Sequence, residues 1–468
     1  MARAVRHREP KSIQFWILVG YLGLVFLMGG GARADITSLI ILRPAAVLVC
    51  GFALFTLGRE HIRRHRFAFA FAAASFLLVA IQLIPLPASL WGSLPGRGII
   101  TEIDAAAQLG EVWRPISMVP IGTWNALYAL FVPLAALLLT VQLGAEERRA
   151  LLPVMIGLGL ISGLLGLLQV IGAPTGPFYL YRVTNDGAAV GLFANRNHHA
   201  VLLACLFPML AVYASSGIQT PEQARLRGGI AVAVALLLVP LLLVAGSRAG
   251  LALGVLGLLA IPILYRKPGF DSGERRGGRW RVVSIVMGGC GVIALALVTV
   301  MFGRGEAISR ILTPSEADEA RFKVWGPIAD MAWQYFPFGS GIGTFVEMYK
   351  IDEPDALLDS TYLNHAHNDW LEVYMTGGAI GLLLLVAAVV AWGLASLRAW
   401  RATTGAGGAR AASHGRMASV LLLMLGLASI GDYPLRAPSL ACLAVILAIW
   451  LGAAERPAIP AQQKRVEV

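Results

Sequence analysis

Long runs of apolar residues, separated by shorter polar segments, follow one another along most of the chain. A helix that crosses the hydrocarbon core of a membrane needs roughly 20 predominantly apolar residues. The pattern therefore predicts an all-α polytopic membrane protein with about twelve transmembrane helices. The predicted spans are residues 13–31, 37–57, 67–86, 122–143, 150–172, 197–214, 228–245, 249–265, 282–302, 371–397, 417–431 and 436–453.

The composition supports this prediction. Of the 468 residues, 57% are hydrophobic and 14% are charged, whereas a typical soluble domain has about 25% charged residues. The net charge of +11 therefore bears on orientation in the membrane and not on nucleic acid, because loops rich in Lys and Arg stay in the cytoplasm. If residues 1–12 are cytoplasmic, the segments on that side carry 25 of the 38 Lys and Arg residues, but only 9 of the 27 Asp and Glu residues. Both termini are thus predicted to be cytoplasmic.

A single membrane domain is expected, with residues 303–370 as a large outer loop between the ninth and tenth helices. Within this loop, apolar and aromatic residues recur at helical spacing over residues 317–336, which predicts a helix at the membrane interface. The glycine-rich residues 336–345 predict a flexible crossing loop. Near the start of the chain, ARAD (32–35) resembles a signal-peptide cleavage site, but an apolar run of about 18 residues favours a retained first helix.

Residues 363–374, LNHAHNDWLEVY, place two histidines directly before the tenth predicted span. One interpretation is a metal site, although His365, His367 and Asp369 supply three zinc ligands at most. A second interpretation is an ordinary helix start, in which Asp369 and Glu372 form a capping pair. A third is a proton-transfer site. The positive end of the helix dipole would keep His367 uncharged, so that it could accept a proton.

Three arginines lie near predicted outer ends of helices. Arg248 follows Ser247 in a tight turn between two apolar spans. Arg196 opens the sixth span, and Arg321 lies near the start of the predicted interfacial helix. Charged residues at membrane depth are costly and usually functional, although Arg248 could instead snorkel to the interface and Arg321 could pair with Asp318. Guanidinium groups and helix N-termini bind phosphate oxygens. A diphosphate on the outer side implies a lipid-linked substrate, because nucleotide donors are cytoplasmic.

Four segments follow one another in the order GLFANRNHHAVLLACLFPML, GSRAGLALG, RFKVWGPIADMAWQYFPFGSGIGTF and HAHNDWLEVYMTGGAIGLLLL. Together they resemble the O-antigen ligase family, bacterial membrane glycosyltransferases that include O-antigen ligases and related polysaccharide polymerases. The resemblance implies an architecture similar to C-type membrane glycosyltransferases, with the large periplasmic loop between helices 9 and 10. It divides the chain into N-terminal helices (1–186), an O-antigen ligase-like core (187–397) and C-terminal helices with a cytoplasmic tail (398–468).

The resemblance also implies an activity at the bacterial inner membrane. Such an enzyme transfers a glycan from undecaprenyl diphosphate to an acceptor hydroxyl on the periplasmic side, without metal, nucleotide or other cofactor. The implied partners are the lipid-linked donor, a lipid A–core or growing polysaccharide acceptor and membrane lipids, with no nucleic acid. Arg248 and Arg321 match the arginines expected to hold the diphosphate, and His367 matches the histidine expected to activate the acceptor hydroxyl. The secondary candidates, from position alone, are Arg196, His365 and Asn368.

Three functions remain open at this point. O-antigen ligation to lipid A–core is the expected function, and polymerisation of a polysaccharide is the alternative within the same family. A transporter or lipid flippase is the alternative outside it, although transporters usually keep ionisable groups near the middle of the membrane. Arg43, near the start of the second span, is not explained by any of these functions.

Overall fold

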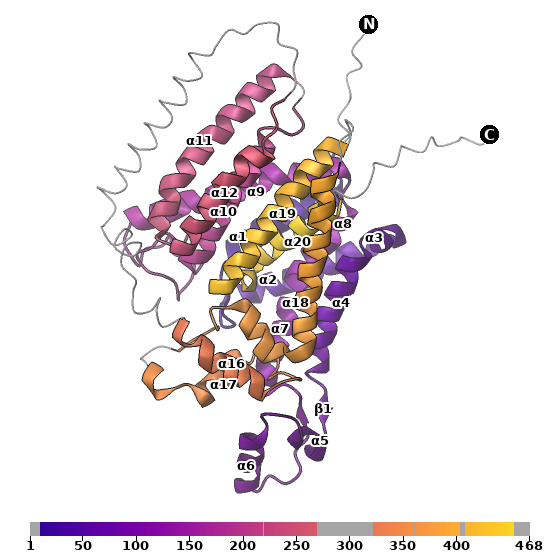
Figure 1. Ribbon diagram of the computed structural model, residues 1–468, viewed down its shortest axis with the longest axis vertical. Coiled ribbons are helices and arrows are strands. Elements are labelled where there is room, and N and C mark those ends of the chain that lie inside the picture. The colour runs from indigo at the N-terminus through magenta and orange to yellow at the C-terminus, as the bar shows by residue number, and fades with distance from the viewer. Residues whose placement is uncertain (1–9, 219, 269–321, 359–361, 403–407, 454–468) are drawn as a thin grey trace, which may run out of the picture.

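The computed structural model describes residues 10–218, 220–268, 322–358, 362–402 and 408–453, and within them the fold is almost entirely helical (Figure 1). Two short strands pair antiparallel, with Pro85 opposite Pro115. In chain order the elements are α1 (Ile13–Met28), α2 (Leu39–Phe55), α3 (Arg59–Arg64), α4 (Arg66–Ile81), β1 (Pro85–Leu86), α5 (Ala88–Gly92), α6 (Gly98–Ala106), β2 (Arg114–Pro115), α7 (Pro120–Ala129), α8 (Phe131–Gln142), α9 (Ala145–Ile171), α10 (Arg196–Tyr213), α11 (Pro221–Ala245), α12 (Arg248–Leu264), α16 (Trp325–Gln334), α17 (Phe345–Asp352), η1 (Asp355–Leu357), α18 (Asp369–Arg401), α19 (Gly408–Gly431), η2 (Pro434–Arg436) and α20 (Pro438–Ala453).

The helices confirm a polytopic membrane protein. By length and composition, five described helical segments can cross a membrane: Pro120–Gln142, α9, α11, α18 and residues Ala412–Gly431 of α19. Five shorter helices are also apolar, namely α1, α2, α4, α12 and α20. Eleven of the twelve predicted spans coincide with helices. The remaining one, the ninth in chain order (residues 282–302), lies outside the described residues. The number of spans therefore stays a prediction.

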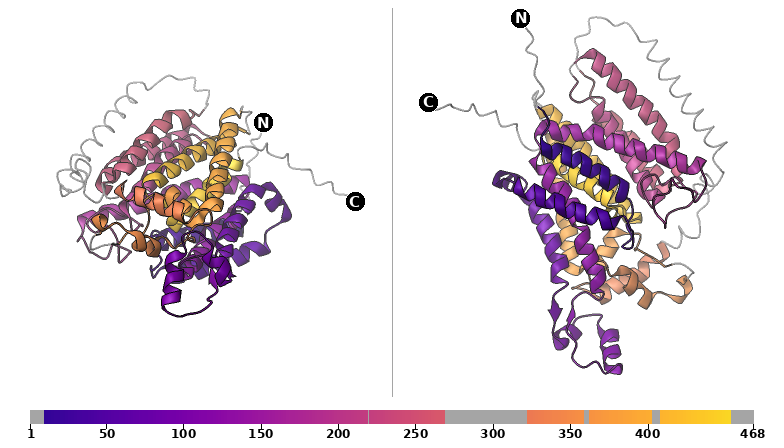
Figure 2. Two further views of the ribbon diagram at one scale, coloured as in Figure 1. Left: turned by 60° about the horizontal axis from the view of Figure 1, so that its bottom comes forward. Right: turned by 180° about the vertical axis from the view of Figure 1, so that it is seen from behind.

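Helix α10 forms the centre of one half of the bundle. Every residue from Asn197 to Val212 is buried, because α9, α11, α12 and α19 all pack against this helix. In the other half, α8 packs against α1, α2 and α20, and the rear view in Figure 2 shows α1 and α2 in front of the yellow C-terminal helices. The apolar core is continuous through both halves.

Long-range hydrogen bonds show which helix ends lie together. The Ser439 amide, at the start of α20, donates to the Gly29 carbonyl just after α1. At the opposite end, the Trp450 indole donates to the Arg148 carbonyl. We call the first end, which also carries the starts of α10, α12 and α18, the site end. We call the other the basic end, because it carries Lys11, Arg148, Arg149, Arg227, Arg398, Arg401 and Arg416.

Helix α18 is broken close to the site end. Gly378 has a φ of 58°, a left-handed conformation that favours glycine, and the break leaves carbonyl groups of α18 without helical partners. The loop 336–345 supplies these partners. The Ser340 amide donates to the Met375 carbonyl (3.0 Å), and the Gly341 amide donates to the Thr376 carbonyl (3.0 Å). Non-helical backbone at membrane depth requires such pairing. The predicted crossing loop is thus present as a loop, and backbone hydrogen bonds hold it to α18.

A buried arginine connects this loop to the segment that carries α5 and α6. Arg97 is fully buried and donates hydrogen bonds to the carbonyl groups of Pro95 (2.9 Å), Ile116 (2.7 Å) and Gly339 (3.0 Å). Burial lowers the pKa of Arg97 to about 10, so the guanidinium is still protonated at neutral pH. Figure 1 shows this segment and α16 and α17 projecting beyond the long helices at the site end.

The interfacial helix is only partly described. Helix α16 covers Trp325–Gln334 and buries Ile328, Met331 and Ala332, whereas Trp333 is 72% exposed. Residues 317–321 of the predicted helix lie outside the described residues.

Candidate functional site

The start of α18 carries the two histidines of the LNHAHNDWLEVY segment. Asn368 is the N-cap residue, and its side chain accepts hydrogen bonds from the amides of Trp370 and Leu371, both at 3.1 Å. This satisfies two amide groups that would otherwise lack partners at a helix start. The predicted capping pair of Asp369 and Glu372 is therefore wrong, because Asn368 is the cap.

His367 has an unusual backbone conformation. Its φ is 47°, in the left-handed region that non-glycine residues rarely occupy, and such strain costs about 1–3 kcal/mol and is often found at functional sites. Contacts on both sides hold this conformation. The preceding amide, of Ala366, donates to Glu372 Oε2 (2.9 Å), and the following residue, Asn368, is fixed by its capping bonds. The His367 ring lies against Tyr433, with ring centroids 4.9 Å apart.

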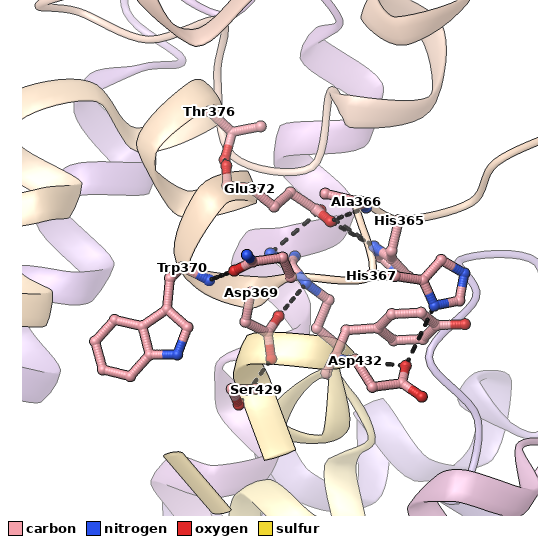
Figure 3. Close-up of polar contacts among 12 residues, drawn as sticks. His365, Ala366, His367, Asp369, Trp370, Glu372, Thr376, Ser429 and Asp432 are labelled. Carbon is pink, nitrogen blue, oxygen red and sulfur yellow. Dashed lines mark hydrogen bonds and ion pairs between the residues drawn. The ribbon is translucent and has the colours of Figure 1, made fainter. Parts of the chain in front are cut away.

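A buried carboxylate faces the His367 ring. The Nδ1 atom of His367 lies 3.5 Å from Asp432 Oδ1, and His198 Nε2 lies 3.6 Å from the same oxygen. Asp432 is 4% exposed, and it accepts hydrogen bonds from Asn197 Nδ2 (2.7 Å) and from the Tyr433 amide (2.9 Å). Figure 3 shows one ring nitrogen of His367 directed at Asp432 and the other directed away from it.

The charge of Asp432 follows from these neighbours. Burial raises the pKa of a carboxyl group, but the close approach of His198 and His367 outweighs it and holds the pKa of Asp432 well below its ordinary value. Asp432 is therefore ionised at neutral pH. An ionised carboxylate favours a proton on the nitrogen that faces it, which fixes the orientation of the His367 ring.

A second polar cluster lies next to the first. Arg436 Nε is 2.8 Å from Asp369 Oδ1, and Arg436 Nη2 is 3.2 Å from Glu372 Oε1. Glu372, which is only 1% exposed, also faces His365 Nδ1 at 3.1 Å, and Ser429 Oγ donates to Asp369 Oδ2 (3.2 Å). A buried carboxylate is tolerated only when it is paired and hydrogen-bonded. Arg436 therefore explains how Glu372 can lie inside the protein.

Tyr433 lies between the two clusters. Its ring centroid is 5.0 Å from that of His198 and 4.4 Å from that of His365, in addition to its contact with His367. Three histidines from two parts of the chain thus surround one tyrosine, which belongs to the turn between α19 and α20. This turn positions the whole site.

Two side chains of α9 form hydrogen bonds with the segment that leads into α10. The carbonyl oxygen of the Gln169 side chain accepts from the amides of Val190 (2.9 Å) and Gly191 (2.8 Å), and its amide group donates to the Gly191 carbonyl (2.9 Å). Ser162 Oγ accepts from the Leu192 amide (3.1 Å). These bonds fix the GLFANRN segment, so Asn197 reaches Asp432 from the first turn of α10.

The candidate residues named from the sequence do not all gather at this site. His367, His365 and Asn368 lie within it. His365 faces Glu372 and Asn368 caps α18, so both have structural partners. Arg248, the first residue of α12, is exposed rather than buried. The remaining two are Arg196, which is half-buried at the start of α10, and Arg321, which lies outside the described residues.

The three possible zinc ligands face different groups. His365 faces Glu372, His367 faces Asp432 and Asp369 faces Arg436. Within the part of the chain that the structure describes, no group of three or more His, Cys, Asp or Glu side chains is arranged to share a metal ion. The residues of the H-A-H-N-D sequence thus do not converge.

Several residues of the site were not identified from the sequence. The most important are Asp432, in the short gap between the last two predicted spans, and Arg436, the first residue of the last predicted span. A charged residue between two apolar spans singles out Arg248, and Asp432 in the gap at 432–435 carries the same signal. The other residues that sequence reasoning missed are Asn197, His198 and Tyr433.

The middle of the chain is similar to a known protein family. Residues 232–386, a third of the chain, match the family model described as O-antigen ligase, and this confirms the resemblance drawn from the sequence motifs. No curated protein matches the chain. The matched residues include Arg248 and His367, whereas Asp432 and Arg436 lie beyond them.

Proposed function

Taking residues 232–386 as an O-antigen ligase domain, we propose that this membrane protein transfers a glycan from undecaprenyl diphosphate to a hydroxyl group of lipid A–core. The family supports function as an O-antigen ligase or polymerase. The donor, the acceptor and the choice of ligation over polymerisation are part of the proposal. The observation that carries it is the strained His367, whose ring is held against buried Asp432 at the site end.

The proposed chemistry follows from the orientation of this ring. With Nδ1 directed at Asp432, Nε2 is the nitrogen that accepts the proton of the acceptor hydroxyl. The hydroxyl oxygen then attacks C1 of the first sugar, forming the new C1–O bond while the C1–O bond to the diphosphate breaks. The electron pair of the broken bond leaves with undecaprenyl diphosphate. A positioned general base of this kind contributes about 10²–10⁴-fold to the rate.

The diphosphate requires positive charge near the breaking bond. We assign this role to Arg248 and Arg321, as the resemblance implies. Arg248 opens α12, whose N-cap Ser247 accepts from the Gly250 amide (3.0 Å). A Cβ atom on Gly250 would touch Ala200 of α10, so α12 begins beside the first turn of the helix that supplies Asn197. This proximity supports Arg248 as a donor-binding residue.

The site end is proposed to face the periplasm of a bacterial inner membrane. The argument rests on an excess of charge, because the segments predicted to be cytoplasmic carry 25 of the 38 Lys and Arg residues and segments rich in Lys and Arg stay in the cytoplasm. A lipid-linked donor is then the only activated sugar expected on the side of His367.

The test uses purified protein with undecaprenyl-diphosphate-linked glycan and lipid A–core, in the presence of EDTA, with products resolved by gel and mass spectrometry. Wild type is compared with His367→Ala and with the control His61→Ala, which removes a histidine from α3 near the basic end. Glycan on the core in wild type and control, and its loss in His367→Ala, is the expected result. Longer glycan on the lipid would establish a polymerase. No release of undecaprenyl diphosphate with any acceptor would favour the transporter.

A further inference from the structure

A cavity lies away from the histidine clusters. This cavity, of about 740 Å³, opens between the first turns of α2 and the junction of α7 with α8. It has no lining residue in common with the site around Asp432. Its walls are mostly apolar, and its one basic side chain is Arg43. The lining residues that matter here are Ile40, Arg43, Val47, Leu48, Tyr128 and Phe131.

Arg43 is half-buried and has no protein anion as a partner in the described part of the chain. Its Nε atom is buried and makes no hydrogen bond. Among the described residues that line the cavity, Asp35 is the only acidic one. Arg33 already occupies that carboxylate, through Nε at 2.9 Å and Nη2 at 2.8 Å. A cation removed from water without a partner is costly, so an anion bound beside Arg43 would stabilise it.

The position of Arg43 indicates the kind of anion. It is the fifth residue of α2, which places it about 6 Å along the helix from the site end, at 1.5 Å per residue. This is the depth at which basic side chains reach the headgroup layer of a membrane. On the surface beside the cavity, Ile40 and Leu48 are each 75% exposed. Apolar side chains exposed on a membrane helix face lipid, so the cavity opens towards the acyl chains.

We propose that this cavity binds one anionic phospholipid. Its phosphate pairs with the Arg43 guanidinium, which can donate two parallel hydrogen bonds to phosphate oxygens. One acyl chain lies along Val47, Leu48 and Phe131, deeper in the membrane than the phosphate. The site is independent of the proposed glycan transfer, because none of its residues belongs to the transfer machinery.

The experiment measures lipid binding to delipidated protein in detergent by native mass spectrometry. Phosphatidylglycerol and phosphatidylcholine with the same acyl chains are added separately to wild type, Arg43→Gln, Arg43→Lys and the control Arg63→Gln on α3. We expect one phosphatidylglycerol to bind in preference to phosphatidylcholine. Arg43→Gln should lower its affinity about tenfold, as expected for loss of a charged hydrogen bond. Arg43→Lys should retain part of it, and the control all of it.

A second variant tests the cavity itself. Val47→Trp fills the groove while leaving Arg43 in place, and should also weaken phosphatidylglycerol binding. Equal binding of the two lipids by wild type, or unchanged binding by Arg43→Gln, would overturn the proposal. If glycerophosphate without acyl chains competed as well as the whole lipid, the site would be one for a soluble phosphate and the proposal would be wrong. Thermal unfolding of each variant, compared with wild type, shows that the fold is retained.

Discussion

Replacing Asp432 by asparagine tests whether this carboxylate acts through His367. The change keeps the size of the side chain and removes its negative charge. The oxygen of the new side-chain amide can still accept from the Tyr433 amide, which now lies at 2.9 Å from Oδ1. Its NH₂ group would then face Asn197 Nδ2, which now donates to Oδ2 at 2.7 Å. One buried hydrogen bond is lost, and the charge that orients His367 disappears.

The two effects differ in size. Loss of a buried hydrogen bond to a charged group costs about 1–3 kcal/mol of stability. The loss of activity should be larger, because a misoriented His367 forfeits general-base catalysis worth about 10²–10⁴-fold, or about 2.7–5.5 kcal/mol of transition-state energy. We therefore expect Asp432→Asn to fold and to bind donor, but to transfer glycan about 10²–10⁴-fold more slowly.

The assay is a cycle of three variants. Release of undecaprenyl diphosphate is measured for Asp432→Asn, His367→Ala and the double variant, beside thermal unfolding of each. Residues that act as one unit are not additive, so the double variant should be no slower than His367→Ala alone. If the two rate losses multiply in the double variant, or if Asp432→Asn transfers glycan at the wild-type rate, the proposed link between the two residues is refuted.

Three further predictions concern stability and pH. Gly378→Ala should destabilise the protein by about 1–2 kcal/mol from its left-handed backbone alone, and by more because the new Cβ would meet the Pro337 carbonyl. Gly393→Ala on the same helix has open space around its Cβ and should be neutral or stabilising by up to about 1 kcal/mol. Arg436→Gln leaves buried Glu372 without its cation and should cost about 3–5 kcal/mol of stability. The effects of Gly378→Ala and Arg436→Gln are read from thermal unfolding in detergent. An unchanged unfolding midpoint in either variant would contradict the expectation for that variant. Although burial opposes it, contact with the histidines keeps the pKa of Asp432 well below its ordinary value. The stability lost in Asp432→Asn, read from thermal unfolding, should therefore shrink as the pH falls below about 4, the unfolded value of an aspartate.

Hydropathy located most of the helices, because a membrane span needs a long apolar run whatever its neighbours are. The eighth predicted span, 249–265, differs from α12 (Arg248–Leu264) by one residue at each end. Helix α11 begins at Pro221, seven residues before the predicted start, because its first turns are polar and hydropathy does not register them. The single predicted span 122–143 contains two helices, α7 and α8, which meet at Leu130.

The site was harder to predict, because its residues are far apart in the sequence. His367 was identified because it stands beside His365 and before an apolar run. Its carboxylate partner, Asp432, lies 65 residues further on, and Asn197 lies 235 residues before that carboxylate. Hydropathy gives the order of the helices but not which of their ends meet. Without that packing, Asp432 was indistinguishable from any other charged residue in a short loop.

The place of Asp432 and Arg436 between α19 and α20 has a consequence for how the protein is made. When the ribosome has just completed the segment around His367, the two side chains that hold that segment do not yet exist. Another 69 residues, up to Arg436, must be added, which takes on the order of ten seconds at ordinary rates of synthesis. Until α19 and α20 enter the membrane, His367 has no carboxylate to orient it and Glu372 has no cation. The site is therefore assembled late, and an unfinished chain is expected to be inactive.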